Sequence, residues 1–180
     1  MAMFDICAYR DQALHGAGGG ILPDGGTITG HHIIPDHCFY YTSGLRGHGD
    51  LSGFLCPSVG RGYSTAKAPV IIVDADANGG KSRRHGLIHS VFDPIELSAR
   101  IANGNQWTYG EAKAAAIRSV VTNCGRYSAQ ELGEILDEYF MGQCLMDDHS
   151  VIRAGETGTM KTAPEPRRSH RNLGPRAKPY

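Results

Sequence analysis

The chain has 180 residues, 41% of them hydrophobic and 20% charged, which suits a single domain with a buried core and excludes wholesale disorder. Its 18 basic and 18 acidic residues give a formal net charge of zero, which argues against a uniformly cationic coat protein for nucleic acid. No apolar run approaches the roughly 18–20 residues that span a bilayer, and residues 1–10 lack the long apolar segment of a secretory signal. We therefore expect neither a membrane partner nor export by a signal peptide.

The first part of the chain combines glycine-rich segments with β-branched runs. Residues 1–26 are rich in glycine and predict a lead-in or linker with little helix. Thr27–Pro35 (TITGHHIIP) predicts a strand or hairpin arm. Residues 42–66 predict a long irregular connection, and Pro69–Asp74 (PVIIVD) predicts the clearest strand of the chain.

A polar turn at Ala75–Gly80 separates that strand from a predicted helical region. Residues 81–91 predict a short helix that ends before Pro94, because proline lacks the backbone N–H that a helix interior needs. Residues 94–102 predict another short helix after the break.

The C-terminal half is predicted to be helical and to end in a basic tail. Tyr109–Cys124 is rich in alanine and predicts a helix, and Ser128-Ala-Gln-Glu131 is a capping box that begins the next one. Helices over residues 109–146, added to the strands before them, predict the α+β class. Residues 155–180 are rich in proline and arginine and predict a disordered basic tail, which would either increase nonspecific affinity for nucleic acid or only keep the chain soluble.

The five cysteines are scattered and form no C-x-x-C pair. This arrangement argues against a disulfide framework and against a zinc site built from cysteines. It predicts buried free thiols in a reducing compartment, at the following positions: Cys7, Cys38, Cys56, Cys124 and Cys144.

Two pairs of histidines are the main candidates for a functional site. Gly30-His31-His32 lies in a predicted strand, where neighbouring side chains point to opposite faces unless the backbone bends. His85 and His89 are four residues apart in a predicted helix, so their imidazoles share a face and can reach one cation. Imidazole suits zinc and other transition ions. Position 86 is glycine, which argues against the H-E-x-x-H metalloprotease motif.

The order of these features resembles a known nuclease family. A strand with a His-His pair, a second strand and a helix with H-x-x-x-H resemble the HNH/endonuclease VII superfamily of ββα-metal nucleases. Within it, GHHIIP at Gly30–Pro35 is similar to the signature of the GHH clade of bacterial toxin nucleases, including type VI secretion and polymorphic toxin effectors. The resemblance covers residues 27–93 and implies a ββα-metal core there, within a nuclease domain over residues 27–154.

The resemblance also implies roles for individual residues. His31, His85 and His89 would bind a divalent metal ion, which could be Mg, Mn, Zn or Ni. His32 would be the general base that removes a proton from water, for which a neutral imidazole is suited near neutral pH. Asn78 would brace the loop and orient that base, although its place in a glycine-rich turn is equally consistent with a turn role.

A metal-dependent, non-specific endonuclease is therefore the predicted function, with DNA as the expected substrate. Lys81, Arg83 and Arg84 precede His85, where they either contact the DNA backbone or only form the solvated start of the helix. The resemblance further implies a toxin used in interbacterial competition, which enters by a contact-dependent secretion system and acts in the cytoplasm of the target cell. It also implies two protein partners: a cognate immunity protein and an upstream secretion-delivery module of the PAAR or VgrG type.

Three alternatives remain open. The first is an RNase toxin of the same fold. The second is a P-loop-like nucleotide-binding protein, because residues 75–82 nearly match G-x-x-x-x-G-K-[ST], although Ala75 replaces the first glycine and Asp74 and Asp76 would repel phosphate. The third is a non-catalytic interaction domain that is held together by a metal ion.

Overall fold

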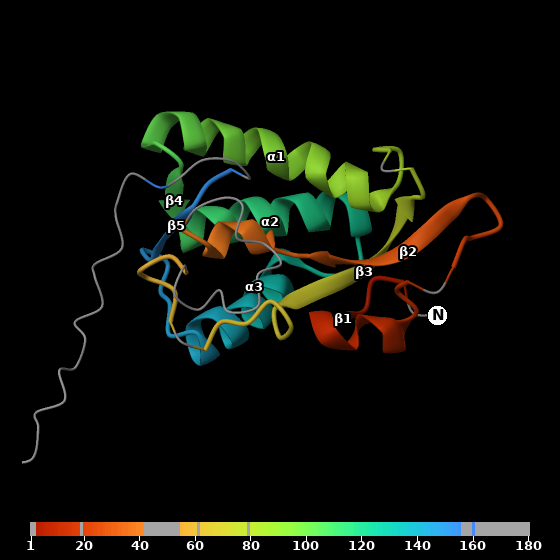
Figure 1. Cartoon of the computed structure of the whole chain (residues 1–180), viewed down its shortest axis with the longest axis horizontal. Coiled ribbons are helices and arrows are strands. Elements are labelled where there is room, and N and C mark those ends of the chain that lie inside the picture. The colour runs from red at the N-terminus through yellow and green to blue at the C-terminus, as the bar shows by residue number, and fades with distance from the viewer. Residues whose placement is uncertain are drawn as a thin grey trace, which may run out of the picture.

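An antiparallel sheet of three strands forms the base of the candidate site (Figure 1). Its strand order is β1-β3-β2, with β1 at Ile6–Ala8, β2 at Gly26–His32 and β3 at Pro69–Asp76. The computed structural model describes residues 3–18, 20–41, 55–60, 62–78, 80–155 and 160. Their mixture of helices and strands confirms the predicted α+β class.

The two predicted strands pair with each other as β2 and β3. The register places His31 opposite Ile71 and His32 opposite Val70. β3 is the central strand and is buried from Pro69 to Asp74, as its continuous apolar run predicts. β2 ends at His32, earlier than the predicted Pro35, because the chain then turns into the short 3-10 helix η2 at Asp36–Phe39.

One long helix replaces the two short helices predicted on either side of Pro94. This helix, α1, runs from Arg84 to Asn103 with Pro94 inside it, so the prediction of a break was wrong. A proline in a helix interior costs about 3 kcal/mol. Packing outweighs this cost here, because the Phe92 ring lies against Trp107 and Glu96 is buried in a hydrogen-bonded network.

The C-terminal helices follow their sequence signals closely. α2 runs from Tyr109 to Cys124, as predicted, and α3 runs from Ala129 to Asp137 behind the predicted capping box of Ser128 and Glu131. A π-helical turn, η4 at Glu138–Gln143, continues α3. α1 and α2 lie side by side along the sheet (Figure 1).

Several short elements were not predicted. Residues 1–26, expected to be a linker, include β1 and the 3-10 helix η1 at Tyr9–His15, and β1 pairs with β3. A second, two-stranded sheet joins β4 at Gln106–Thr108 to β5 at Val151–Arg153. Most of the predicted irregular connection over residues 42–66, and nearly all of the predicted tail over 155–180, lie outside the described residues.

Alternation along β2 separates two environments. Ile28 packs with Ile72 and Ala17 in a small apolar cluster on the side of η1, and the backbone N–H of Gly30 donates to Gln12 of η1. The odd-numbered side chains point to the opposite face, which α1 covers. His31 belongs to this second face, together with Ile71 of the main hydrophobic core.

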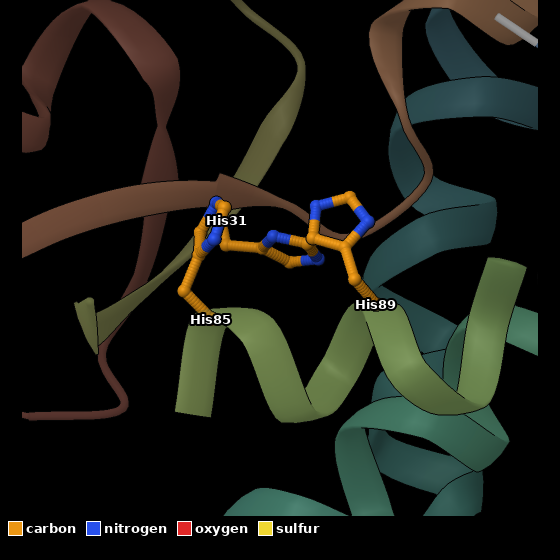
Figure 2. A group of neighbouring side chains, drawn as sticks. All are labelled: His31, His85 and His89. Carbon is orange, nitrogen blue, oxygen red and sulfur yellow. The ribbon is translucent and has the colours of Figure 1, made fainter. Parts of the chain in front are cut away.

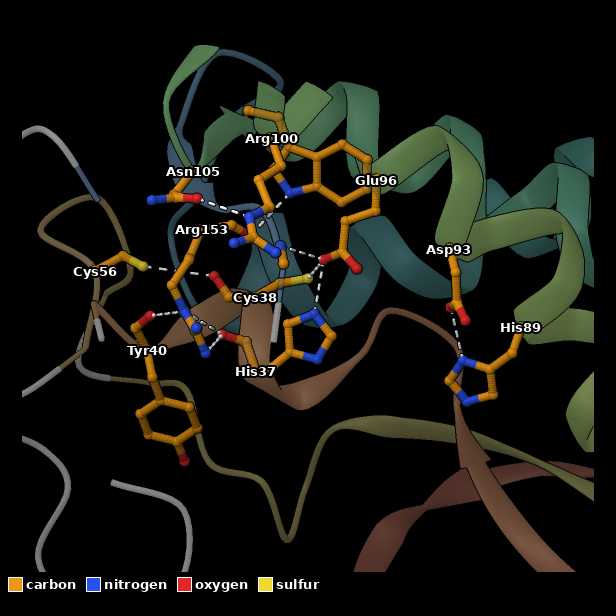
Figure 3. A network of polar contacts seen from close by, with 12 residues as sticks. His37, Cys38, Tyr40, Cys56, His89, Asp93, Glu96, Arg100, Asn105 and Arg153 are labelled. Carbon is orange, nitrogen blue, oxygen red and sulfur yellow. Dashed lines mark hydrogen bonds and ion pairs between the residues drawn. The ribbon is translucent and has the colours of Figure 1, made fainter. Parts of the chain in front are cut away.

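A buried polar network joins η2, α1 and β5 (Figure 3). Glu96 accepts hydrogen bonds from His37 Nε2 at 2.6 Å and from the backbone N–H of Gly155 at 2.8 Å. Arg153, only 2% exposed, donates to the carbonyl groups of His37 and Tyr40. These contacts hold the segment after β2 against the C-terminal part of α1. No helix in the described part of the chain is both long and apolar enough to cross a membrane.

Candidate metal centre

Three imidazoles meet between β2 and α1 (Figure 2). The ring of His31 points from β2 toward the rings of His85 and His89, which stand one turn apart on α1. The ring centroids are 4.9 Å apart for each pair with His31 and 5.0 Å apart for His85 and His89. One ring nitrogen of each residue lies within 4.8 Å of the others, so the three could hold one metal ion. The structure thus brings together all three residues that the sequence analysis assigns as metal ligands.

Local backbone features bring these rings together. The i, i+4 spacing places His85 and His89 on the face of α1 that meets β2. Gly86 lets the preceding loop approach the start of α1, because a Cβ atom there would lie 2.4 Å from the Cα atom of Lys81. His31 is supplied by the odd-numbered face of β2 and is only 4% exposed.

The environment of two of these imidazoles favours the neutral form, which can bind a metal. Burial lowers the pKa of His31 well below 6.5, and the neighbouring His89, His85 and His32 lower it further. Burial and the nearby His89 also lower the pKa of His85, against a smaller opposing effect of Asp93. A metal ion needs the unprotonated nitrogen, so both shifts favour metal binding near neutral pH.

A carboxylate orients the third ring. Asp93 Oδ1 lies 2.9 Å from His89 Nδ1, one helical turn further along α1 (Figure 3). Because a carboxylate only accepts hydrogen bonds, Nδ1 is the donor in this contact, and Nε2 is the nitrogen that remains available to a metal ion. This is the usual arrangement behind a histidine that binds a metal.

Replacing Asp93 by asparagine should therefore weaken metal binding without unfolding the protein. We expect the dissociation constant for Zn²⁺ or Co²⁺ to rise about 10- to 100-fold, the usual effect of losing such a carboxylate. Calorimetric titration of the two proteins measures it. Glu134→Gln, the same change on the exposed surface of α3, is the matched control. Equal metal affinity in Asp93→Asn and the wild type would contradict this role.

An open pocket of about 350 Å³ adjoins the histidines. Its walls come from β2, from the end of β3, from the loop before α1 and from the first turns of α1. The residues that line it are Thr27, Thr29, Ala75, Asp76, Gly80, Lys81, His85, Gly86, His89 and Asp93. A small molecule, or part of a larger one, can therefore reach His85 and His89 from solvent.

His32, assigned as the general base, lies apart from the three ligands. Its ring stacks on Tyr9 of η1 with centroids 4.7 Å apart, whereas His31 contacts α1. This is the alternation expected of neighbouring residues in a regular strand. His32 does not line the pocket, so its role in catalysis stays a prediction.

The three residues predicted to contact the DNA backbone differ in their exposure and in their position relative to the pocket. Lys81 lines the pocket and is 69% exposed, although its Nζ lies 3.8 Å from an Asp93 oxygen. Arg83 is only 17% exposed and pairs with Asp24 at 3.0 Å. Arg84 is half-exposed and does not line the pocket. Asn78 lies exposed in the turn after β3, also outside the pocket.

Carboxylates offset this basic cluster. Besides Asp24 and Asp93, two aspartates of β3 contact its arginines: Asp74 lies 3.5 Å from Arg84, and Asp76 lies 3.3 Å from Arg83. Lys81, Arg83 and Arg84 are thus outnumbered by four aspartates. The surroundings of the pocket are therefore not electropositive in the absence of a metal ion.

The start of α1 does not form a phosphate-binding loop. Asp76 accepts hydrogen bonds at 2.8 Å from both the backbone N–H and the hydroxyl of Ser82. Its carboxylate occupies the place where the backbone N–H groups of a P-loop would hold a phosphate. This geometry argues against the nucleotide-binding alternative based on Lys81.

A second group of metal-binding residue types is better explained as structure. His37, Cys38 and Glu96 also lie close enough together to hold an ion, and all three are buried. Burial and the adjacent Glu96 raise the pKa of the Cys38 thiol well above 9.0, whereas metals bind the thiolate. Glu96 already accepts several hydrogen bonds, and the guanidinium of Arg153 supplies a positive charge next to this group. The histidine cluster on β2 and α1 is therefore the better candidate.

No family model, curated protein or solved structure matches this chain at a significant level. The site is accordingly interpreted from its own geometry. Sequence reasoning did not identify Asp93, although its position four residues after His89 in a predicted helix was a usable signal. It also did not identify Thr27 and Thr29, which line the pocket. The only feature of the sequence that could have indicated them is their place on the same strand face as His31.

Proposed function

We propose that this chain is a metal-dependent nuclease with a ββα-metal core made of β2, β3 and α1. The observation that carries the proposal is the meeting of His31 from a strand with His85 and His89 from the following helix, beside an open pocket. The connectivity of strand, antiparallel strand and helix agrees with the family that the GHH motif resembles.

The number of ligands favours catalysis over a purely structural metal site. Structural zinc sites have four protein ligands and are closed, whereas catalytic sites have three and leave a position open. The group of His31, His85 and His89 has three members among the described residues and adjoins a solvent-accessible pocket. These features favour an enzyme over an interaction domain held together by a metal.

The residues around the pocket suit hydrolysis of a phosphodiester. A divalent ion bound there would supply a positive centre for the phosphate oxygens and for the charge that develops on the leaving oxygen. His31, His85 and His89 would hold it, and Asp93 would fix the orientation of His89. Lys81, at the edge of the pocket, would contact the backbone of the nucleic acid next to the cleaved bond.

The biological setting follows from the family resemblance alone. On that basis we propose a toxin that cleaves DNA in a competing bacterium after contact-dependent delivery. The cognate immunity protein would block the entrance to the pocket, and the delivery module would be supplied from an upstream segment. RNA is the alternative substrate, because a histidine-bound metal ion can act on either backbone.

Cleavage of plasmid DNA by a His32 variant tests both the function and the assignment of the base. His32→Phe keeps a ring to stack on Tyr9 but has no nitrogen that can accept a proton. We expect the wild type to relax plasmid DNA only with a divalent ion, and to lose this activity when a chelator is added. We expect His32→Phe to reduce the rate by about 10²- to 10⁴-fold, the usual contribution of a general base.

The control variant is Tyr127→Phe, which removes a hydroxyl from an aromatic side chain away from the pocket. It should cleave at the rate of the wild type. Full activity of His32→Phe would move the base to another residue and leave the metal site in place. Absence of cleavage of both DNA and RNA, under any divalent ion, would contradict the proposed function itself.

A further inference from the structure

We propose that the pocket beside the three histidines is a subsite for the nucleoside next to the cleaved phosphate, not for a second phosphate. This inference rests on the proposed function and extends it to the substrate class that the site selects. It draws on the charge, the shape and the hydrogen-bonding groups of the pocket.

The charge of the pocket disfavours an additional phosphate. Two of its lining residues, Asp76 and Asp93, are aspartates, against one lysine, Lys81. Arg83, which contacts the lining residue Asp76, is also shared with Asp24 and Asp74. The amides at the start of α1 are likewise directed at the Asp76 carboxylate. A phosphate placed there would face carboxylates, whereas the metal position between the histidines would attract it.

The same groups suit a neutral ligand that donates hydrogen bonds. Carboxylates accept hydrogen bonds, and threonine hydroxyls both donate and accept. Thr27 and Thr29 lie on the same face of β2 as His31, at intervals of two residues, so they continue along the strand from the metal position. Sugar hydroxyls and the N–H groups of a nucleobase are partners of this kind.

The pocket has room for such a group because small residues form part of its wall. Its glycines let the loop before α1 pack closely: a Cβ atom at Gly80 would lie 2.9 Å from Asp76 Oδ2, and one at Gly86 would meet the backbone of Lys81. Ala75 adds only a methyl group to the same wall. The resulting volume of about 350 Å³ lies within the range of small-ligand pockets, roughly 300–1,000 Å³.

Binding of small nucleotides to the full chain loaded with Co²⁺ tests the subsite without relying on cleavage. The probes are inorganic phosphate, UMP and dUMP, measured by calorimetry, and Co²⁺ loading is followed separately by its visible absorption. We expect UMP or dUMP to bind at least tenfold more tightly than inorganic phosphate. The two nucleotides differ only in the 2′-hydroxyl, so tighter binding of UMP would place the sugar hydroxyl against the acceptors, and equal binding would place the base there.

Thr29→Val replaces one hydroxyl on β2 with a methyl group and hardly changes the shape of the side chain. We expect it to weaken nucleotide binding by about 2- to 10-fold, the usual effect of one lost hydrogen bond, and to leave binding of phosphate and Co²⁺ unchanged. Thr122→Val, the same change at an exposed position of α2, is the matched control and should bind all probes as the wild type does.

Two results would overturn this inference while leaving the proposed function intact. One is equal affinity for phosphate and for both nucleotides in the Co²⁺-loaded wild type. The other is unchanged nucleotide binding in Thr29→Val. Failure of the wild type to bind Co²⁺ would instead overturn both the metal-dependent function and the subsite that depends on it.

Discussion

Replacing His85 by alanine should abolish tight metal binding and metal-dependent cleavage together. His85 is one of three imidazoles that could hold one ion together, and two histidines alone would hold a divalent ion poorly. We expect metal affinity to fall by more than the roughly 10- to 100-fold that follows loss of a supporting carboxylate. Calorimetric titration with Zn²⁺ measures the affinity, and plasmid relaxation measures the activity.

The fold should survive this substitution, because the side chain of His85 is only partly buried and lines the open pocket. His149→Ala, which removes an exposed histidine far along the chain, is the matched control and should leave both measurements unchanged. Metal affinity that is equal in His85→Ala and the wild type would place the ion elsewhere, with the group around Glu96 as the next position to examine.

Replacing Glu96 by alanine should destabilise the protein more than any other single change near α1. Glu96 is 5% exposed and accepts hydrogen bonds from His37, from Gly155 and from the thiol of Cys38. Truncation leaves these buried donors without their acceptor and removes one partner of the buried pair of His37 and Glu96. Losses of this kind cost about 3–5 kcal/mol of unfolding free energy. Urea unfolding followed by circular dichroism measures it.

The same carboxylate should make stability depend on pH. Burial alone would raise the pKa of Glu96, but the hydrogen bond and charge of His37, with the Gly155 N–H, lower it below 4.5 in the folded protein. A carboxylate with a lowered folded pKa stabilises the fold above its unfolded pKa, and this stabilisation is lost as the pH falls through the folded value.

Glu96→Gln keeps the shape of the side chain and removes the titrating group. Its unfolding free energy should therefore fall less steeply than that of the wild type below about pH 4.5. Glu134→Gln, at an exposed site, should follow the wild-type curve. Parallel curves for Glu96→Gln and the wild type would show that Glu96 does not contribute to acid sensitivity.

The cluster of three histidines could be predicted because local rules place most of it. The spacing of His85 and His89 needs only a helix to put both rings on one face, and the chain forms that helix. His31 could be added because a strand precedes the helix in the expected family order. The contact of His31 with His85 and His89 depends on how α1 packs against the sheet. Sequence periodicity does not predict this packing in detail.

Other features of the site depend on contacts between distant parts of the chain. Arg83 was predicted to face DNA, but its partner Asp24 comes from a turn 59 residues earlier, which no local pattern reveals. β1, β4 and β5 have three residues each, too few to show a periodicity. The break predicted at Pro94 failed because buried neighbours stabilise the helix beyond its local preference.

The position of His32 shows that two adjacent histidines of a motif need not face the same site. Two adjacent histidines in a regular strand point to opposite faces, and the stacking of His32 on Tyr9 follows this rule. A role for both residues at one phosphate therefore requires the substrate to reach around the end of β2, or requires the backbone to move. Loss of cleavage in the His32→Phe variant would indicate a catalytic role for His32. Full activity would indicate that His32 only stacks on Tyr9.

The central claim is that His31, His85 and His89 bind one divalent ion. Anomalous diffraction at the zinc absorption edge, from crystals of the full chain grown with Zn²⁺, tests it most directly. We predict a single strong peak about 2.0–2.1 Å from one nitrogen of each of the three imidazoles. A peak between His37, Cys38 and Glu96, or none between β2 and α1, would contradict the claim.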